Sequence, residues 1–461
     1  MSNNTFPPEF LFGVATSSFQ IEGYTDVDGR GECIWDRFCA TEGKVKNGDD
    51  GTRACEHFVR YPEDIKLMQE LGVDAYRFSI AWPRILPTGF EEKPLQAGLD
   101  FYNRLVDALL EANITPWVTL YHWDLPQPLE DAGGWSDRMI VDKFCHFADI
   151  MSTALGDRVG HWITHNEPWV VSHLGYCVGE HAPGRKSWKD SLAAAHHVLL
   201  SHGRAVPIIR NNLRVPNAKV GITLNLCPSE PASPSTHDAK ANQWFDGFFN
   251  RWYLDPVLKG SYPQDMLEDY AEKKHISGVH PDWLQDGDLE EISVPTDFLG
   301  INYYSRAVIR SDKVSEEENE PRTVFEDGER TAFDWEVHAP SLRRLLNRLN
   351  QDYAAISSIY ITENGCSYPT PPNENGVVHD EARERYFRQH LDACAQSIED
   401  GVPLDGYFAW SLLDNFEWAE GYEQRFGLTW VDFETQERIL KNSAHYYAKV
   451  IAAHEVFPKE E

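Results

Sequence analysis

The stretch YPEDIKLMQELGVDAYRFSI, residues 61–80, contains a helix pattern followed directly by a strand pattern. Pro62 suits the first turn of a helix, and Gly72 is placed to end it. Between them, Ile65, Met68 and Leu71 recur at helical spacing, and the run after Gly72 is rich in apolar and aromatic residues. The stretch therefore predicts a helix over Tyr61–Gly72 and a strand over Ala75–Ile80.

The same order recurs along the chain, because eight short β-branched or aromatic runs alternate with amphipathic segments. Such alternation implies a parallel sheet with crossover helices. Eight strands favour a closed (β/α)8 barrel over an open sheet, with inserted loops that account for the length. We expect residues 1–461 to form this α/β barrel as a single domain. The predicted strands are Leu11–Ala15, Ala75–Ile80, Thr115–Leu120, Trp162–His165, Val220–Leu224, Phe298–Ile301, Ile359–Thr362 and Gly406–Ala409.

Two segments are predicted to be exposed loops. Ser311–Arg330 contains the acidic run SEEENE at 315–320, and Pro369–Gly376 is rich in proline and asparagine. Neither segment is long enough to serve as an interdomain linker, which agrees with a single domain.

The composition is strongly acidic. Asp and Glu number 73 against 42 Lys and Arg, for a net charge of −31. A negative field repels phosphate backbones and anionic lipid headgroups, so we expect no nucleic-acid partner and no membrane partner. The excess charge serves either solubility or adaptation to salt, and the sequence leaves both open.

Three features predict a cytoplasmic protein. The N-terminal residues MSNNTFPPEF lack the basic region of a secretory signal, and no apolar run approaches the roughly 18 residues that a membrane helix needs. The eight cysteines are dispersed and form no CxxC pair, which favours buried thiols over a disulfide framework. The oligomeric state stays open, and a homo-oligomer is one alternative.

Polar residues follow several predicted strands at the end where a barrel builds its active site. Any one of them could be a cap or an ion pair, but together they share one structural position. Two are the carboxylates Glu167 and Glu363, and aromatic and amide side chains accompany them. Glycoside cleavage needs such a pair, because one carboxyl protonates the leaving oxygen and a carboxylate opposite attacks or stabilises the anomeric centre. Aromatic faces pack on sugar rings, and amides bind their hydroxyls.

The motifs resemble those of glycoside hydrolase family 1, the β-glucosidase family. FLFGVATSSFQIEG (10–23) resembles its N-terminal signature, HNEP (165–168) its acid/base motif and ITENG (361–365) its nucleophile motif. The similarity continues through YRFS (76–79), YHWD (121–124), GINYY (300–304) and SLLDNFEW (411–418). These matches run in order from about residue 6 to Phe433, nearly the whole chain.

The resemblance implies a retaining β-glycosidase that acts on small β-glucosides and cello-oligosaccharides. It makes Glu167 the general acid/base and Glu363 the nucleophile. The charge of Glu363 would help raise the pKa of Glu167, which must start protonated. Arg77 would keep Glu363 ionised, with a purely structural ion pair as the alternative. Tyr304 would hydrogen-bond the nucleophile, and Asn302 would support the site.

The resemblance also implies a sugar-binding set. Asn166 would hold the 2-hydroxyl of the sugar, and Trp410 would form the floor of the subsite. Trp335 matches the tryptophan on the aglycone side, but the residues after it depart from the family pattern, which leaves the aglycone preference open. Trp123 and Trp169 line the cleft or pack beneath it. The remaining hydroxyl-binding residues are Gln20, His122, Glu417 and Trp418.

Other interpretations of the function fit the sequence less well. A 6-phospho-β-glycosidase is disfavoured because Glu417 would repel a 6-phosphate. A catalytically silent sugar-binding module is disfavoured because both carboxylates stand in intact motifs. We expect no cofactor and no metal, since His196 and His197 lack further ligands at metal spacing. The choice among glucose, galactose and fucose stays open.

Overall fold

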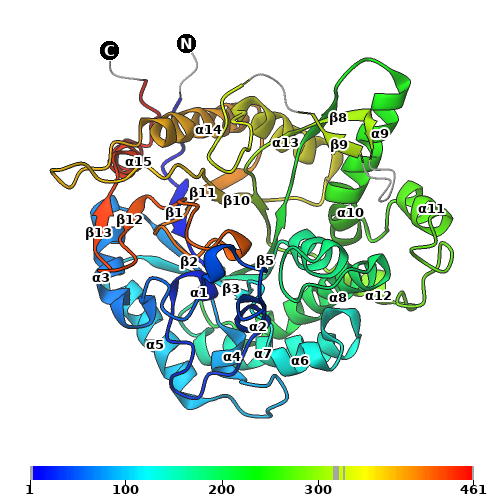
Figure 1. Ribbon diagram of the computed structural model, residues 1–461, viewed down its shortest axis with the longest axis horizontal. Helices are drawn as coiled ribbons and strands as arrows, with labels where there is room; N and C mark the ends of the chain where they lie inside the picture. The colour runs from blue at the N-terminus through cyan, green and yellow to red at the C-terminus, as the bar shows by residue number, and fades with distance from the viewer. Residues whose placement is uncertain (1–3, 315–320, 325–327, 459–461) are drawn as a thin grey trace.

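The computed structural model describes residues 4–314, 321–324 and 328–458. Eight parallel strands close into a central barrel that helices surround (Figure 1). The prediction of a (β/α)8 barrel is confirmed, and each predicted strand matches a barrel strand with ends that differ by at most two residues. The barrel strands, in order around it, are β1 (Leu11–Ala15), β2 (Ala75–Ser79), β3 (Thr115–Tyr121), β4 (His161–Asn166), β5 (Lys219–Asn225), β7 (Phe298–Asn302), β10 (Ile359–Asn364) and β11 (Leu404–Trp410).

The longer helices lie outside the strands and cover the barrel. They are α3 (His57–Leu71), α5 (Gln96–Glu111), α7 (Met139–Leu155), α8 (Trp188–Asn212), α9 (Thr236–Asp246), α10 (Trp252–Lys259), α11 (Gln264–Glu272), α13 (Ala339–Asp352), α14 (Glu381–Glu399) and α15 (Asn442–Ala453). Short helices in the connections are α1 (Ser18–Ile21), α2 (Ile34–Cys39), α4 (Trp82–Ile85), α6 (Gln127–Asp131) and α12 (Asp288–Ile292). Single turns are η1 (Lys46–Gly48), η2 (Gly134–Ser136) and η5 (Trp418–Glu420), and the π-helical segments are η3 (Val170–Val178) and η4 (Gly247–Arg251).

The predicted start of α3 is wrong by four residues. The helix begins at His57, so Pro62 lies inside it rather than in its first turn. Two contacts stabilise the additional turn: the Phe58 backbone N–H donates to the Glu22 carbonyl outside the helix, and His57 Nδ1 lies 2.7 Å from Oδ2 of Asp64 in the same helix. A proline near a helix start removes few intrahelical bonds, and these contacts offset the loss.

The prediction of a loop at Ser311–Arg330 is wrong in part. Ser311 belongs to β8 (Ala307–Val314), which pairs with β9 (Pro321–Thr323) and β6 (Ser229–Pro231) in a three-stranded sheet beside α9. The acidic run at 315–320 lies outside the described residues. The prediction for 369–376 is confirmed, because this segment contains no helix or strand and is mostly exposed.

Aromatic rings fill the interior of the barrel. The Trp117 ring contacts the rings of Phe298, Tyr360 and Phe408 at centroid distances of 5.4, 4.7 and 5.0 Å. Gly13 makes room for this layer, because a Cβ there would lie 2.4 Å from the Phe408 ring. Side chains from alternate strands stack in this way inside such barrels. The interior of the barrel below the strand ends is therefore filled with packed side chains.

The two ends of the chain meet. β1 pairs with β11 along the register from Leu11–Gly406 to Ala15–Trp410, and Thr5 bridges to Glu455. We propose on this ground that the chain folds as one domain, because no part of the barrel closes without both ends. Within the described ranges, none of the helices is both long and apolar enough to cross a membrane. None of the eight cysteines, all of which lie in the described ranges, forms a disulfide, and five of them are buried.

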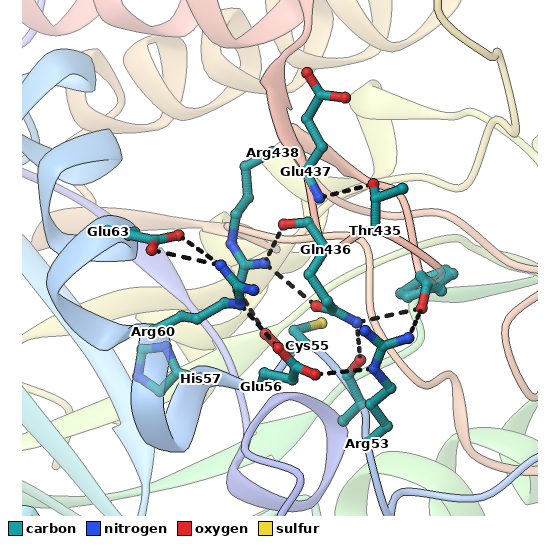
Figure 2. Close-up of polar contacts among 12 residues, drawn as sticks. Arg53, Cys55, Glu56, His57, Arg60, Glu63, Thr435, Gln436, Glu437 and Arg438 are labelled. Carbon is teal, nitrogen blue, oxygen red and sulfur yellow. Dashed lines mark hydrogen bonds and ion pairs between the residues drawn. The ribbon is translucent and has the colours of Figure 1, made fainter.

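Polar contacts bind the start of α3 to the hairpin of β12 (Thr429–Val431) and β13 (Arg438–Leu440). In Figure 2, Arg438 contacts Cys55 and Gln436, and Arg60 pairs with Glu56 and Glu63. The Arg438 guanidinium also donates to the Asp64 carboxylate at 2.9 Å, and both side chains are buried. Burial would raise the pKa of Asp64, but His57 and Arg438 outweigh it and hold this pKa below its usual value.

We expect Asp64→Asn to lower the free energy of unfolding by about 3 kcal/mol, because it leaves the buried Arg438 charge without its partner. Urea denaturation measures this loss. Glu63→Gln is the matched control: Glu63 pairs with Arg60 at 3.2 Å but is 55% exposed, so we expect a change below about 0.5 kcal/mol. Equal losses in the two variants would contradict the argument.

Candidate active site

The carboxyl-terminal ends of the barrel strands surround a cavity of about 750 Å³. This position is where barrels of this class place catalytic groups. The volume lies in the upper part of the range for pockets that enclose small organic ligands. Nine of the predicted site residues line the cavity: His122, Glu167, Asn302, Tyr304, Trp335, Glu363, Trp410, Glu417 and Trp418.

The two predicted carboxylates have different partners. Glu363, at the end of β10, accepts a hydrogen bond from Arg77 Nη1 at 2.6 Å and one from the Tyr304 hydroxyl at 2.6 Å. Glu167, directly after β4, accepts one from Asn302 Nδ2 at 2.5 Å. One carboxylate therefore has a cation and a phenol as side-chain donors, whereas the other has a neutral amide.

This asymmetry places the proton of the pair. Burial raises the pKa of Glu167 well above its usual value, and the negative charge of Glu363 raises it further. Burial also raises the pKa of Glu363, but the guanidinium of Arg77 and the hydroxyl of Tyr304 oppose the rise. The proton of the pair therefore resides on Glu167, and Glu363 carries the charge.

Arg77 is fully buried and connects four barrel strands. Its guanidinium donates to Glu363, to the Thr362 carbonyl at 3.0 Å, to Asn166 Oδ1 at 2.6 Å and to Thr119 Oγ1 at 3.1 Å. Asn166 is buried, and its Nδ2 lies 3.2 Å from His122 Nε2. These contacts orient the nucleophile candidate and its neighbours.

Aromatic rings and a third carboxyl form one end of the cavity. The His122 ring lies nearly parallel to the rings of Trp410 and Trp418, at centroid distances of 5.9 and 6.0 Å. Burial lowers the pKa of His122 well below its usual value, so the imidazole is neutral. Burial, with a contribution from Glu363, raises the pKa of Glu417 to about 8. Gln20 is buried and donates to Glu417 at 3.4 Å.

Four residues other than glycine on the cavity wall have left-handed backbone conformations. The φ angles are 76° at Trp123, 52° at Glu167, 60° at Asp334 and 53° at Trp418. Residues other than glycine rarely adopt such φ angles, and each residue in this conformation costs on the order of 1–3 kcal/mol of folding free energy. The Glu167 backbone is held by a hydrogen bond from its N–H to the Thr223 carbonyl. The fold maintains this strain where side chains must point into the cavity.

The outer part of the cavity contains residues that the strand-end pattern did not predict. Trp123 and Trp169 both line the cavity, so of the two alternatives left open for them, lining the cleft is correct and packing beneath it is not. Trp335 packs on Phe333 with ring centroids 4.4 Å apart. Most of the unpredicted lining residues come from the connections between barrel strands, outside the strand-end motifs. They include Phe245, Phe249, Arg306, Phe333, Glu336 and Phe426.

The paired histidines of α8 bond to other protein groups. His196 lies 3.0 Å from the Tyr262 hydroxyl and 3.0 Å from Asp288, and His197 contacts the Trp135 carbonyl. Across the part of the chain that the structure describes, no group of three or more His, Cys, Asp or Glu side chains could hold a metal ion.

This arrangement defines a class: barrel enzymes that cleave glycosidic bonds with two carboxyl groups. Comparison with known proteins places the chain within that class. The model of glycosyl hydrolase family 1 matches residues 2–456, and the chain belongs to this family. It is therefore a glycosidase, as predicted.

The sequences of known relatives align with nearly the whole length of this chain. Beta-glucosidase A of Acetivibrio thermocellus is 46% identical over 98% of this chain and 99% of its own. The 1,4-beta-D-glucan glucohydrolase of Thermotoga neapolitana is 44% identical over 97% of this chain and 98% of its own. A solved structure of the beta-glucosidase from Thermotoga maritima in complex with glucoimidazole superposes with a TM-score of 0.92, at 43% identity, over 98% of this chain and 99% of that one.

We expect Tyr304→Phe to lower kcat by roughly 10–100-fold, because Glu363 loses a hydrogen bond to its charged form. The same loss raises the pKa of Glu363, so the acidic limb of the kcat/KM profile should move to higher pH. Tyr303→Phe is the matched control, since the Tyr303 hydroxyl donates to the His338 carbonyl and not to a carboxylate. An unmoved acidic limb in Tyr304→Phe would contradict this role.

Proposed function

We propose that this glycosidase releases terminal glucosyl residues from small β-glucosides and cello-oligosaccharides with retention of configuration. The observation that carries the proposal is the asymmetry of the two carboxyl groups, one ion-paired to Arg77 and one bonded to an amide. Retention needs a charged nucleophile and a protonated acid in the same cavity, and these surroundings favour that distribution. The names of the relatives support the β-glucoside substrate.

In the first step, a carboxylate oxygen of Glu363 attacks the anomeric carbon. The bond from that carbon to the glycosidic oxygen breaks, and Glu167 donates its proton to the departing oxygen. The products are an alcohol and a glucosyl ester of Glu363. As the ester forms, the negative charge of Glu363 is neutralised, which lowers the pKa of Glu167 and prepares it for the next step.

In the second step, ionised Glu167 takes a proton from a water molecule. The water oxygen attacks the anomeric carbon from the side that the aglycone left, and the ester bond to Glu363 breaks. Glucose is released with the β configuration, Glu363 regains its charge, and Glu167 regains its proton. Two inversions give net retention.

The glycone is held at the end of the cavity that contains Glu417. We assign Trp410 as the floor beneath the sugar ring, because its flat face and the nearby His122 ring suit an apolar sugar face and a hydroxyl edge. Glu417 and Gln20, which contact one another, would bind the 4- and 6-hydroxyls. Asn166, held by Arg77, would bind the 2-hydroxyl.

The charge of the cavity favours a neutral sugar over a phosphorylated one. Among the described residues that line it, seven carboxyl side chains face two Lys or Arg side chains, Lys44 and Arg306. Arg306 is already paired with Glu336. A 6-phosphate beside Glu417 and Glu420 would be repelled, so the 6-phospho-β-glycosidase alternative is less favoured.

We further propose a cytoplasmic location. Eight thiols without a disulfide suit a reducing compartment.

Azide rescue tests the assignment of the two carboxyls. Glu363→Ala should stop turnover, and added azide should restore it with an α-glucosyl azide product, because the cavity opens on the face opposite the leaving group. Glu167→Ala should still react with substrates that have good leaving groups and should give the β-azide. The anomer is read by proton NMR. The same anomer from both variants would contradict the assignment of Glu363 as nucleophile and Glu167 as acid/base.

Glu417→Ser tests the glycone site. Removing a buried carboxyl that bonds two hydroxyls should lower kcat/KM for p-nitrophenyl β-glucoside by at least about 10-fold. Above the Glu417 pKa of about 8, the same change removes a like charge from the phosphate position, so the ratio of 6-phosphoglucoside to glucoside kcat/KM measured above that pH should rise. Glu423→Ser, at an exposed carboxylate that pairs with Lys46, is the control and should change neither value. An unchanged ratio in Glu417→Ser would remove this residue from the glycone site.

A further inference from the structure

The segment 411–418, directly after β11, contains the predicted sugar-binding carboxyl of Glu417. Backbone hydrogen bonds join the first half of this segment to the returning chain at 426–429. Among them, the Asp414 N–H donates to the Thr429 carbonyl at 2.9 Å. Neither Asp414 nor Thr429 lines the cavity, so the conformation of the segment depends on contacts outside the cavity.

The Asp414 carboxylate is fully buried and pairs with two cations. Lys441 Nζ donates to Oδ1 at 2.7 Å, and Arg425 Nη1 donates to Oδ2 at 2.9 Å. The Gly427 backbone N–H donates to Oδ1 at 2.9 Å as well. Charge-assisted hydrogen bonds of this kind are strong and directional, so three donors fix the orientation of the carboxylate.

Lys441 is fully buried, which is costly because its ammonium loses its hydration. Burial, with a contribution from Arg383, lowers the pKa of Lys441 to about 8, and Asp414 opposes the fall. The ammonium therefore stays charged in neutral and acidic solution. Moving Asp414 away would leave this charge buried without its partner, so the ion pair holds Asp414 in one position.

The same charges reach the segment that follows the nucleophile strand β10. Arg383 of α14 is fully buried and donates to the Cys366 carbonyl at 2.7 Å and to the Tyr368 carbonyl at 2.8 Å. It also donates to the Arg425 carbonyl at 2.8 Å. Through Arg425 and Asp414, these contacts fix the segments after β10 and β11 relative to one another.

An amide side chain connects the position of Asp414 to that of Glu417. Gln20 Nε2 donates to the side-chain oxygen of Asn415 at 3.0 Å, to the Phe416 carbonyl at 2.9 Å and to Glu417 at 3.4 Å. Asn415 directly follows Asp414 and is buried. A displacement of Asp414 would therefore move Glu417 relative to Gln20.

We propose that Lys441 and Asp414 are positioning residues for Glu417, so that the preference for sugars with a 6-hydroxymethyl group depends on an ion pair outside the cavity. The inference rests on the proposed function, in which Glu417 binds the 4- and 6-hydroxyls. Loss of the pair should weaken the contact to the 6-hydroxyl more than the contacts at the anomeric carbon, because Glu167 and Glu363 belong to β4 and β10 and not to segment 411–418.

The test compares two aryl glycosides at about pH 6, where Lys441 is charged. p-Nitrophenyl β-xyloside lacks the hydroxymethyl group of p-nitrophenyl β-glucoside, so the glucoside-to-xyloside ratio of kcat/KM reports the contact to that group. Lys441→Met keeps the apolar stem and removes the charge, while Asp414 retains Arg425 and Gly427 as donors. We expect the ratio to fall by roughly 3–10-fold, the loss that corresponds to weakening one hydrogen bond.

A double-mutant cycle tests whether the effect passes through Glu417. In a Glu417→Ser background, Lys441→Met should change the ratio no further, because the contact that it weakens is already absent. A fall of the same size in both backgrounds would overturn the proposal, since the ion pair would then act on the ratio independently of Glu417.

Arg138→Met is the matched control, because it also removes a cation from a buried carboxylate. Arg138 Nη1 donates to Asp288 at 2.8 Å, where α12 meets the start of α7. Neither residue lines the cavity or contacts segment 411–418 through a hydrogen bond with Asp288, so the ratio should keep its unsubstituted value. A fall equal to that in Lys441→Met would show a general effect of lost stability and would overturn the proposal.

Arg425→Gln is a second variant that leaves the Lys441 pair in place. The Arg425 side chain is 14% exposed, so the fold should persist, and the ratio should fall by a smaller factor. A ratio at the unsubstituted value in both variants would refute the positioning role, as would the failure of both to fold, which would assign the network to stability alone. If the unsubstituted protein releases no glucose from p-nitrophenyl β-glucoside, the proposed function itself fails.

Discussion

The buried guanidinium of Arg77 is the interaction on which the site depends. It lies at the centre of the barrel, with no exposed surface, and its donors reach β3, β4 and β10 from β2. A buried cation is costly unless its donors are satisfied, and here a carboxylate, an amide oxygen, a carbonyl and a hydroxyl satisfy them. The same bonds orient Glu363 and Asn166, so the contacts that stabilise the charge also build the reactive geometry.

The ion pair with Arg77 explains why three buried carboxyl groups behave differently in one cavity. Glu167, Glu363 and Glu417 are all buried, which raises all three pKa values. Only Glu363 has an ion pair with Arg77, so the negative charge concentrates on that residue. In the proposed mechanism, the same type of side chain serves as nucleophile and as acid because the barrel supplies a cation to one position and an amide to the other.

The cavity has two chemically distinct ends. The inner end combines carboxyls with the rings of His122, Trp410 and Trp418, and the backbone strain at Glu167 and Trp418 aims side chains into it. The outer end is built from η4 and the segments beside β8, outside the barrel. A barrel can thus keep its catalytic end constant while connections of different length and composition shape the outer end.

The sequence by itself determined the eight barrel strands, their order and the residues of the inner end, because alternation and strand-end motifs are local patterns. The start of α3 was mispredicted, since the contacts of His57 and Phe58 with Asp64 and Glu22 outweigh the local signal of Pro62. The strand β8 and the outer wall were decided only by tertiary structure. Phe249 lies in a π-helical segment far from any barrel strand end, and Arg306 lies beyond the motif that ends β7. The positions of both depend on ion pairs between residues distant in sequence, such as Asp246 with Arg348 and Arg306 with Glu230. Local periodicity carries no information about such pairs, because they form only after the chain has folded.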